Sequence, residues 1–116
     1  MIKNQLIYVA HPFGGDKANK YSIDTIMENL VMLDKNNTYL SPLHNFSMLD
    51  FDTQYSKGLK ICLDMLNKCD ALVLCGDWET SKGCIGEWSF AIAKGMPIYT
   101  WKEWTDKFKE QGDNSR

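Results

Sequence analysis

The segment that follows a predicted buried strand, Asp70 to Gly76, carries the pattern SxGxxxE, formed by Ser81, Gly83 and Glu87. The pattern opens a predicted helix, and backbone N–H groups at a helix start bind anions such as phosphate. Gly83 would let such a ligand approach the backbone, and Ser81 could add a hydroxyl donor. Glu87 projects toward the same space, where a carboxylate can attack a sugar carbon or stabilise an oxocarbenium-like centre.

These residues also have a purely structural interpretation. A carboxylate near a helix N-terminus is common and stabilises the helix by about 0.3 to 1 kcal/mol. The spacing alone favours this interpretation for Glu87. Asp70 lies at the far end of its strand and is expected to serve structure. Each of four other residues has two possible roles. His11 could contact a ligand or cap its loop, and Phe13 and Trp78 could stack on a base or pack in the ordinary way. Lys82 could attract a phosphate or be solvated.

Strands and helices are predicted to alternate along the chain. Strands are expected at Gln5 to Ala10, Thr38 to Ser41, Asp70 to Gly76 and Pro97 to Trp101, and helices at Asn19 to Asp34, Gln54 to Lys68, Cys84 to Lys94 and Lys102 to Glu110. The third of these helices is expected to turn inward Ile85, Trp88, Ser89 and Ile92. The alternation predicts a flavodoxin-like or Rossmann-like three-layer α/β sandwich with a mostly parallel sheet of four or five strands. The long segment Pro42 to Thr53 is expected to be a loop that covers a pocket or packs on its own core.

Length and charge limit the classes of protein. A chain of 116 residues predicts one domain, residues 1–110, followed by a flexible polar tail, residues 111–116. The net charge of -2 and the spread of lysines along the chain do not indicate a nucleic-acid surface, so a small molecule is the expected partner. The N-terminal apolar run is too short for a signal peptide or membrane span, which predicts a cytoplasmic protein without membrane association.

The cysteines are not arranged as a metal site. The 4 cysteines lack a CxxC pair, and both histidines lie far from them in sequence, so no metal is expected. Reduced and mostly buried thiols are the expectation.

Three segments resemble the nucleoside 2-deoxyribosyltransferase superfamily, which includes small uncharacterised proteins: YVAHPFGG, CLDMLNKCDALVL and GDWETSKGCIGEWSFAIAKGMPI. The resemblance extends from Leu6 to Tyr99. It implies that Glu87 is the nucleophile that attacks the anomeric carbon of a nucleoside and releases the base, with transfer to another base or to water. It also implies a substrate site formed by Tyr8, His11, Phe13, Gly14, Gly15, Asn19, Trp78, Ser81 and Gly83.

Two positions depart from the pattern of the superfamily. Deoxyribosyltransferases carry an Asp six residues before the nucleophile, whereas the similar deoxynucleoside 5'-monophosphate N-glycosidases carry a Ser that contacts phosphate; Ser81 therefore favours a phosphorylated ligand. Relatives place an acid at the position of Cys62. Without an acid to protonate the departing base, cleavage should slow by about 10²- to 10⁴-fold. Asp64 lies about 200° round a regular helix from Cys62 and cannot simply replace it.

The residues and the resemblance together predict cleavage or transfer at the N-glycosidic bond of a nucleoside or nucleoside 5'-monophosphate. Glu87 would be the nucleophile, and neither a metal nor an organic cofactor is expected. Relatives assemble as dimers or larger oligomers, which implies a homo-oligomer. One alternative is a nucleotide-binding module without turnover, which Cys62 favours, and another is an interaction protein that has lost the pocket. A Glu87 carboxylate held in a buried ion pair and facing away from any cavity would contradict the enzymatic prediction.

Overall fold

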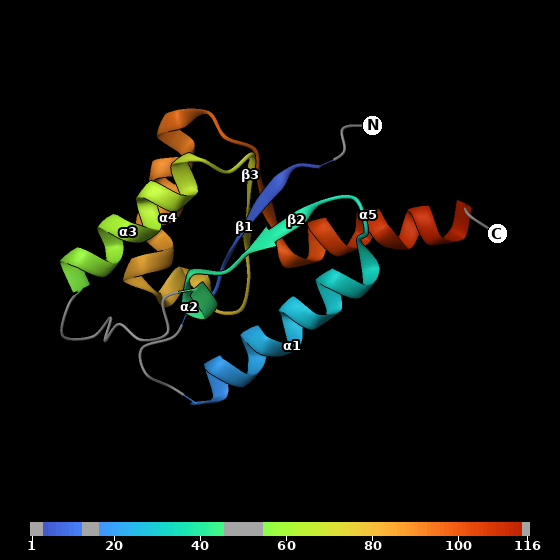
Figure 1. Cartoon of the computed structure of the whole chain (residues 1–116), viewed down its shortest axis with the longest axis horizontal. Coiled ribbons are helices and arrows are strands. Elements are labelled where there is room, and N and C mark those ends of the chain that lie inside the picture. Colours follow the sequence, from blue (N-terminus) through green and yellow to red (C-terminus); the bar gives the residue numbers. More distant parts are fainter. Residues whose placement is uncertain (1–3, 13–16, 46–54, 115–116) are drawn as a thin grey trace.

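Four strands form a parallel sheet at the centre of the structure (Figure 1). The computed structural model describes residues 4–12, 17–45 and 55–114. The spatial order of the strands is β2-β1-β3-β4. Each strand lies inside its predicted range: β1 (Leu6–Ala10), β2 (Thr38–Leu40), β3 (Ala71–Leu74) and β4 (Ile98–Thr100).

Successive residues of the two central strands face opposite sides of the sheet, as strand geometry requires. One buried cluster contains Tyr8, Ala10, Leu72 and Leu74, and the other contains Ile7, Val9, Ala71 and Val73. Because both faces are covered, β1 and β3 are apolar at nearly every position. The Tyr8 hydroxyl is the one polar side-chain group in these two strands. A buried hydroxyl needs a hydrogen-bond partner, which must lie on the sheet face that bears Tyr8.

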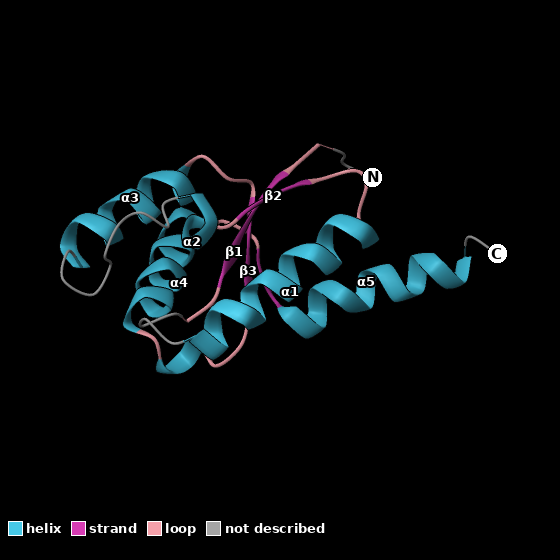
Figure 2. Cartoon of the chain, turned by 60° about the horizontal axis from the view of Figure 1, so that its bottom comes forward, coloured by secondary structure: helices cyan, strands magenta, loops and turns pink. Residues whose placement is uncertain are grey.

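Helices cover both faces of the sheet (Figures 1 and 2). The helices α3 (Tyr55–Asn67) and α4 (Lys82–Lys94) pack on the face that bears Tyr8. The helices α1 (Lys17–Leu33) and α5 (Trp101–Asn114) pack on the other face. The predicted three-layer α/β sandwich is therefore confirmed.

The inward face of α4 agrees with the prediction at Trp88, which packs against the buried cluster around Tyr8, and differs elsewhere. Its buried residues are Cys84, Glu87 and Ala91, whereas Ile92 is 52% exposed and Ser89 is exposed as well. The helical spacing of apolar residues predicted that the larger side chains of this helix face inward. Small side chains and the carboxylate face the sheet instead, because the sheet supplies the carboxylate with a hydrogen-bond donor.

Helix ends also differ from the prediction. A short helix, α2 (Pro42–Asn45), begins the segment expected to be a loop, and residues 46–54 of that segment lie outside the described part. Helix α5 continues to Asn114, past its expected end at Glu110. In the described ranges, no helix combines the length and apolar character that crossing a lipid bilayer requires.

The strand order places a topological switch point between β1 and β3. From β1 the chain moves to β2 on one side and then to β3 on the other. In open α/β sheets, ligands bind outside the carboxyl ends of the strands at such a point. At the opposite edge, Asp70 Oδ2 accepts a hydrogen bond of 2.7 Å from the N–H of Leu6, which confirms the structural role expected for Asp70.

Candidate functional site

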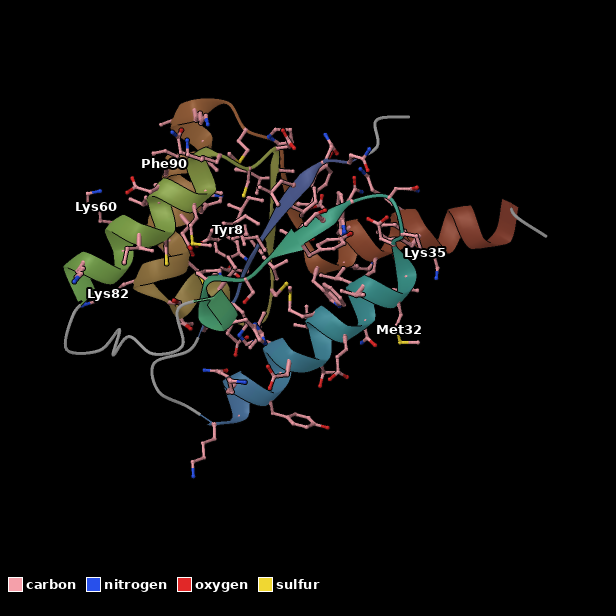
Figure 3. The ribbon with its side chains drawn as sticks, in the orientation of Figure 1. Tyr8, Met32, Lys35, Lys60, Lys82 and Phe90 are labelled. Carbon is pink, nitrogen blue, oxygen red and sulfur yellow. The ribbon has the colours of Figure 1, made fainter. Side chains whose placement is uncertain are left out.

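Glu87 and Tyr8 meet inside the layer between the sheet and helices α3 and α4. Tyr8 is 0% exposed and Glu87 is 5% exposed. The Tyr8 hydroxyl donates a hydrogen bond to Glu87 Oε2. Figure 3 shows Tyr8 in the interior of the molecule, between β1 and these two helices. The structure therefore brings the predicted nucleophile onto one of the predicted substrate-site residues, across 79 positions of sequence.

Burial dominates the electrostatics of this pair. Removal from water raises the pKa of Glu87 from 4.5 to about 7, although the hydrogen bond from Tyr8 acts in the opposite direction. Burial, and then the nearby charge of Glu87, raise the pKa of Tyr8 well above its usual range. Among the described residues, no cation forms an ion pair with Glu87. The buried ion pair that would have contradicted a catalytic role is not found there.

Two thiols lie near this carboxylate. Burial, followed by the charge of Glu87, raises the pKa of Cys62 in α3 to about 11, although Tyr8 acts in the opposite direction. The same two causes raise the pKa of Cys84 in α4 to about 12. All 4 cysteines of the chain are free thiols. Within the described ranges, no group of three or more His, Cys, Asp or Glu side chains could hold a metal ion.

The start of α4 is capped by Ser81. The Ser81 hydroxyl accepts a hydrogen bond of 3.3 Å from the backbone N–H of Cys84. The hydroxyl proton stays available to a ligand, because a serine hydroxyl can accept and donate at once. At Gly83, an added Cβ would meet the Ser81 side chain at 3.9 Å, which is ordinary contact distance. Lys82 is exposed (Figure 3), in agreement with a solvated lysine.

His11 fastens the end of β1 to α1. Its Nδ1–H donates a hydrogen bond of 2.6 Å to the carbonyl of Pro12, which can only accept. The other ring nitrogen, Nε2, pairs with the Ser22 hydroxyl at 3.0 Å. Both ring nitrogens thus have protein partners, which supports the loop-capping interpretation of His11.

Gly76 closes the end of β3 against this imidazole. The φ angle of Gly76 is +62°, and an added Cβ would lie 2.8 Å from Nε2 of His11. A side chain at Gly76 would strain the left-handed backbone and clash with the imidazole. The loops after β1 and β3 therefore touch at the switch point. The sequence predicts Gly76 only as the last residue of a strand and gives no sign of this contact.

Replacing Gly76 with alanine is expected to lower the free energy of unfolding by more than the same change at Gly95. Gly95 also has a positive φ, +76°, but nothing lies within 4 Å of an added Cβ. Gly95→Ala should therefore show only the backbone cost of about 1 to 2 kcal/mol, and Gly76→Ala should exceed it through the clash with His11. Urea unfolding of both variants measures the difference. Equal decreases in the free energy of unfolding would show that the His11 ring moves away from the new methyl group without cost.

The other predicted site residues are more scattered. Trp78, in the short 3₁₀ helix η1 (Trp78–Thr80), packs on Trp88 with ring centroids 5.9 Å apart. Asn19 lies half-buried in α1 and is already engaged in an interaction. The remaining predicted contacts, Phe13, Gly14 and Gly15, fall outside the described residues.

A second polar cluster was not expected from the sequence. His44 Nε2 lies 2.5 Å from Asp24 Oδ1, and His44 Nδ1 lies 2.9 Å from the Ser41 hydroxyl. The residue types match a serine-hydrolase triad, but the two ring nitrogens are exchanged: the serine pairs with Nδ1 and the aspartate with Nε2, the reverse of a triad. The cluster holds α2 against α1 and is structural.

Solved structures share this fold. A 2-deoxyribosyltransferase from the psychrotolerant bacterium Bacillus psychrosaccharolyticus is similar with a TM-score of 0.64 at 21% identity, over 82% of this chain and 70% of that chain. A conserved protein from Enterococcus faecalis V583 has a TM-score of 0.63 at 20% identity, over 84% of this chain and 62% of that chain. No protein with a curated description is significantly similar.

The fold is thus that of the nucleoside 2-deoxyribosyltransferase group, which confirms at the level of structure the resemblance seen in the sequence. Residues 5–100 match the model of the family described as Domain of unknown function (DUF4406). The chain belongs to that family.

Proposed function

We propose that the protein cleaves the N-glycosidic bond of a nucleoside or nucleoside 5'-monophosphate, or transfers its sugar, with Glu87 as the nucleophile. The observation that carries the proposal is the buried Glu87 carboxylate, held by the Tyr8 hydroxyl on a helix that starts beyond the carboxyl end of β3. Such a carboxylate is oriented and shielded from water, as attack on an anomeric carbon requires.

The proposed reaction has two steps. A Glu87 oxygen attacks the anomeric carbon as the base departs, and an ester between Glu87 and the sugar forms. Water or a second base then attacks the same carbon and frees the carboxylate. With a pKa of about 7, a substantial fraction of Glu87 is ionised at neutral pH. The Tyr8 hydrogen bond favours that ionised form.

The proposed substrate is held from two sides. A 5'-phosphate would accept hydrogen bonds from the Ser81 hydroxyl and from the first N–H groups of α4, near Gly83. Phe13 and Trp78 would surround the base or the sugar. The reaction uses no metal and no organic cofactor, and by the superfamily resemblance the protein acts as a homo-oligomer.

The activity of the structural neighbour supports this proposal. The Bacillus psychrosaccharolyticus protein is a 2-deoxyribosyltransferase, described as a biocatalyst for the synthesis of nucleosides. At 21% identity the similarity extends to the fold, and the site residues of this chain carry the chemical part of the proposal. Base release from a panel of nucleosides and nucleoside 5'-monophosphates, followed by chromatography, is the direct test.

Changing Ser81 to aspartate is expected to weaken binding of a nucleoside 5'-monophosphate by about 10- to 100-fold, the worth of a hydrogen bond to a charged group. Aspartate is as good an N-cap as serine, so α4 should keep its start. Its charge, however, repels phosphate. Binding of the matching nucleoside without phosphate should change little, and calorimetry measures both ligands. If the substitution weakened binding of both ligands equally, the start of α4 would not be the phosphate site.

A nucleotide-binding module without turnover is the second candidate, and the thiol of Cys62 beside Tyr8 favours it. This candidate predicts that nucleotides raise the melting temperature of the protein, since a ligand of the native state stabilises it. No base would be released. The base-release panel therefore separates the two candidates.

A further inference from the structure

Among the described residues, one phenol and two thiols interact with the Glu87 carboxylate. The Tyr8 hydroxyl of β1 donates a hydrogen bond to it, and its charge raises the pKa of Cys62 in α3 and of Cys84 in α4. Burial keeps the pKa of each group above neutral, at about 11 for Cys62 and about 12 for Cys84. All three groups therefore hold their protons tightly when Glu87 is ionised.

The acid nearest to Cys62 in sequence points elsewhere. The Asp64 side chain is 66% exposed and forms an ion pair of 2.7 Å with Lys60. The Tyr8 proton is already donated to Glu87, and transferring it to a substrate would leave a buried phenolate. A thiol with a pKa of about 11 is a poor proton donor, because general acids work best with a pKa near the operating pH.

The charge of the base decides whether such a donor is needed. A neutral nucleobase leaves as an anion unless a proton reaches it during bond cleavage. A base that is already a cation takes the electron pair of the glycosidic bond and leaves as a neutral molecule. Its positive charge is also attracted by a buried carboxylate, most strongly where water is excluded.

We infer that the preferred substrates of this site are N-glycosides whose base is a cation, such as a pyridinium or a 7-alkylated purine. The inference rests on the proposed function and narrows its substrate class. Glu87, Tyr8 and Cys62 carry it: a buried carboxylate without a cationic partner among the described residues, beside a phenol and a thiol.

The reaction balances without a protein acid. A Glu87 oxygen forms a bond to the anomeric carbon, the bond from that carbon to the base nitrogen breaks, and its electron pair neutralises the cation. Water then attacks the anomeric carbon, the bond to Glu87 breaks, and the proton of the water passes to solvent. The products are the free sugar phosphate and the neutral base.

The test compares 7-methylguanosine 5'-monophosphate with guanosine 5'-monophosphate, in ribose and 2-deoxyribose forms, at one mildly acidic pH. Each rate is divided by the uncatalysed rate of that substrate, since the methylated base also leaves faster in water. The wild-type protein is expected to accelerate release of 7-methylguanine at least tenfold more than release of guanine. Equal or greater acceleration for guanine would overturn the inference while the proposed function stands.

Two matched variants test the role of the thiol. Cys62→Asp places an acid at this position and should raise guanine release by about 10²- to 10⁴-fold. Cys62→Asn has nearly the same shape without the acid and should not. A folded Cys62→Asp protein that gains no guanine release overturns the inference. If this variant does not fold, the comparison of the two substrates in the wild type decides alone. Release of neither base above the rate of Glu87→Gln would refute the proposed function itself.

Discussion

Replacing Glu87 with glutamine is expected to reduce base release from the preferred substrate by about 10³-fold or more, approaching the loss of about 10⁶-fold seen when an enzyme nucleophile is removed. Glutamine has nearly the same shape as glutamate, and its carbonyl oxygen can still accept the hydrogen bond from Tyr8. Its amide oxygen, however, is a far weaker nucleophile at an anomeric carbon. Single-turnover release of the base measures the loss.

The matched control for this experiment is Glu79→Gln. Glu79 lies exposed in η1, one turn before α4, so the same change of charge occurs near the site without touching the interior pair. Its activity should remain within a few-fold of the wild type. A Glu87→Gln protein that keeps its circular dichroism spectrum and retains activity within tenfold would rule out Glu87 as the nucleophile.

The same substitution is expected to remove a pH-dependent loss of stability that reaches about 3 kcal/mol at alkaline pH. In the folded chain the pKa of Glu87 is about 7, against an ordinary value of 4.5. Each tenfold difference in proton affinity is worth about 1.4 kcal/mol, so ionising Glu87 in its buried position costs the folded state about 3 kcal/mol.

Whether the free energy of unfolding rises or falls with pH depends on which state, folded or unfolded, binds more protons. Below pH 4.5 both states keep the Glu87 proton, and ionisation of Glu87 imposes no penalty. As the pH rises from 4.5 to about 7, the unfolded chain loses this proton first, so the free energy of unfolding falls. Above pH 7 the penalty is complete. The Glu87→Gln protein has no carboxyl group at this position, so it does not pay this ionisation cost.

Urea unfolding of the wild type and Glu87→Gln between pH 4 and 9 measures this effect. The difference between the two curves should grow through the interval from 4.5 to about 7 and then level off. Subtraction cancels the other titrating groups, which the two proteins share. Glu79→Gln should give a nearly constant difference from the wild type, because Glu79 is exposed. A flat difference for Glu87→Gln would show that the carboxyl group is hydrated in the folded state.

Taken together, these two expected results describe a group that is kept in spite of its cost to folding. A carboxylate used only to stabilise the start of α4 would sit in water, where it costs nothing. Glu87 is instead buried with a single hydrogen-bond donor among the described residues. Activity and stability should therefore change in opposite directions at this position, as is common at functional sites.

The sequence by itself determined the order of the elements and the class of the fold. All four strands lie inside their predicted ranges, and the pattern SxGxxxE marked the start of α4. The superfamily resemblance of the sequence also selected Glu87, whose spacing alone favoured a structural role. These features are local, so a single segment contains the information that specifies them.

Only the tertiary structure decided how these elements meet. The sequence listed Tyr8 among substrate contacts, but the register of β1 in the sheet turns its hydroxyl onto Glu87. Apolar periodicity assigned Ile92 to the inside of α4, whereas the sheet accepts Glu87 because it offers a donor there. His11 and Gly76 meet because β1 and β3 are neighbours. Each contact joins segments distant in sequence, and the packing of strands and helices, which no local pattern records, sets their distances.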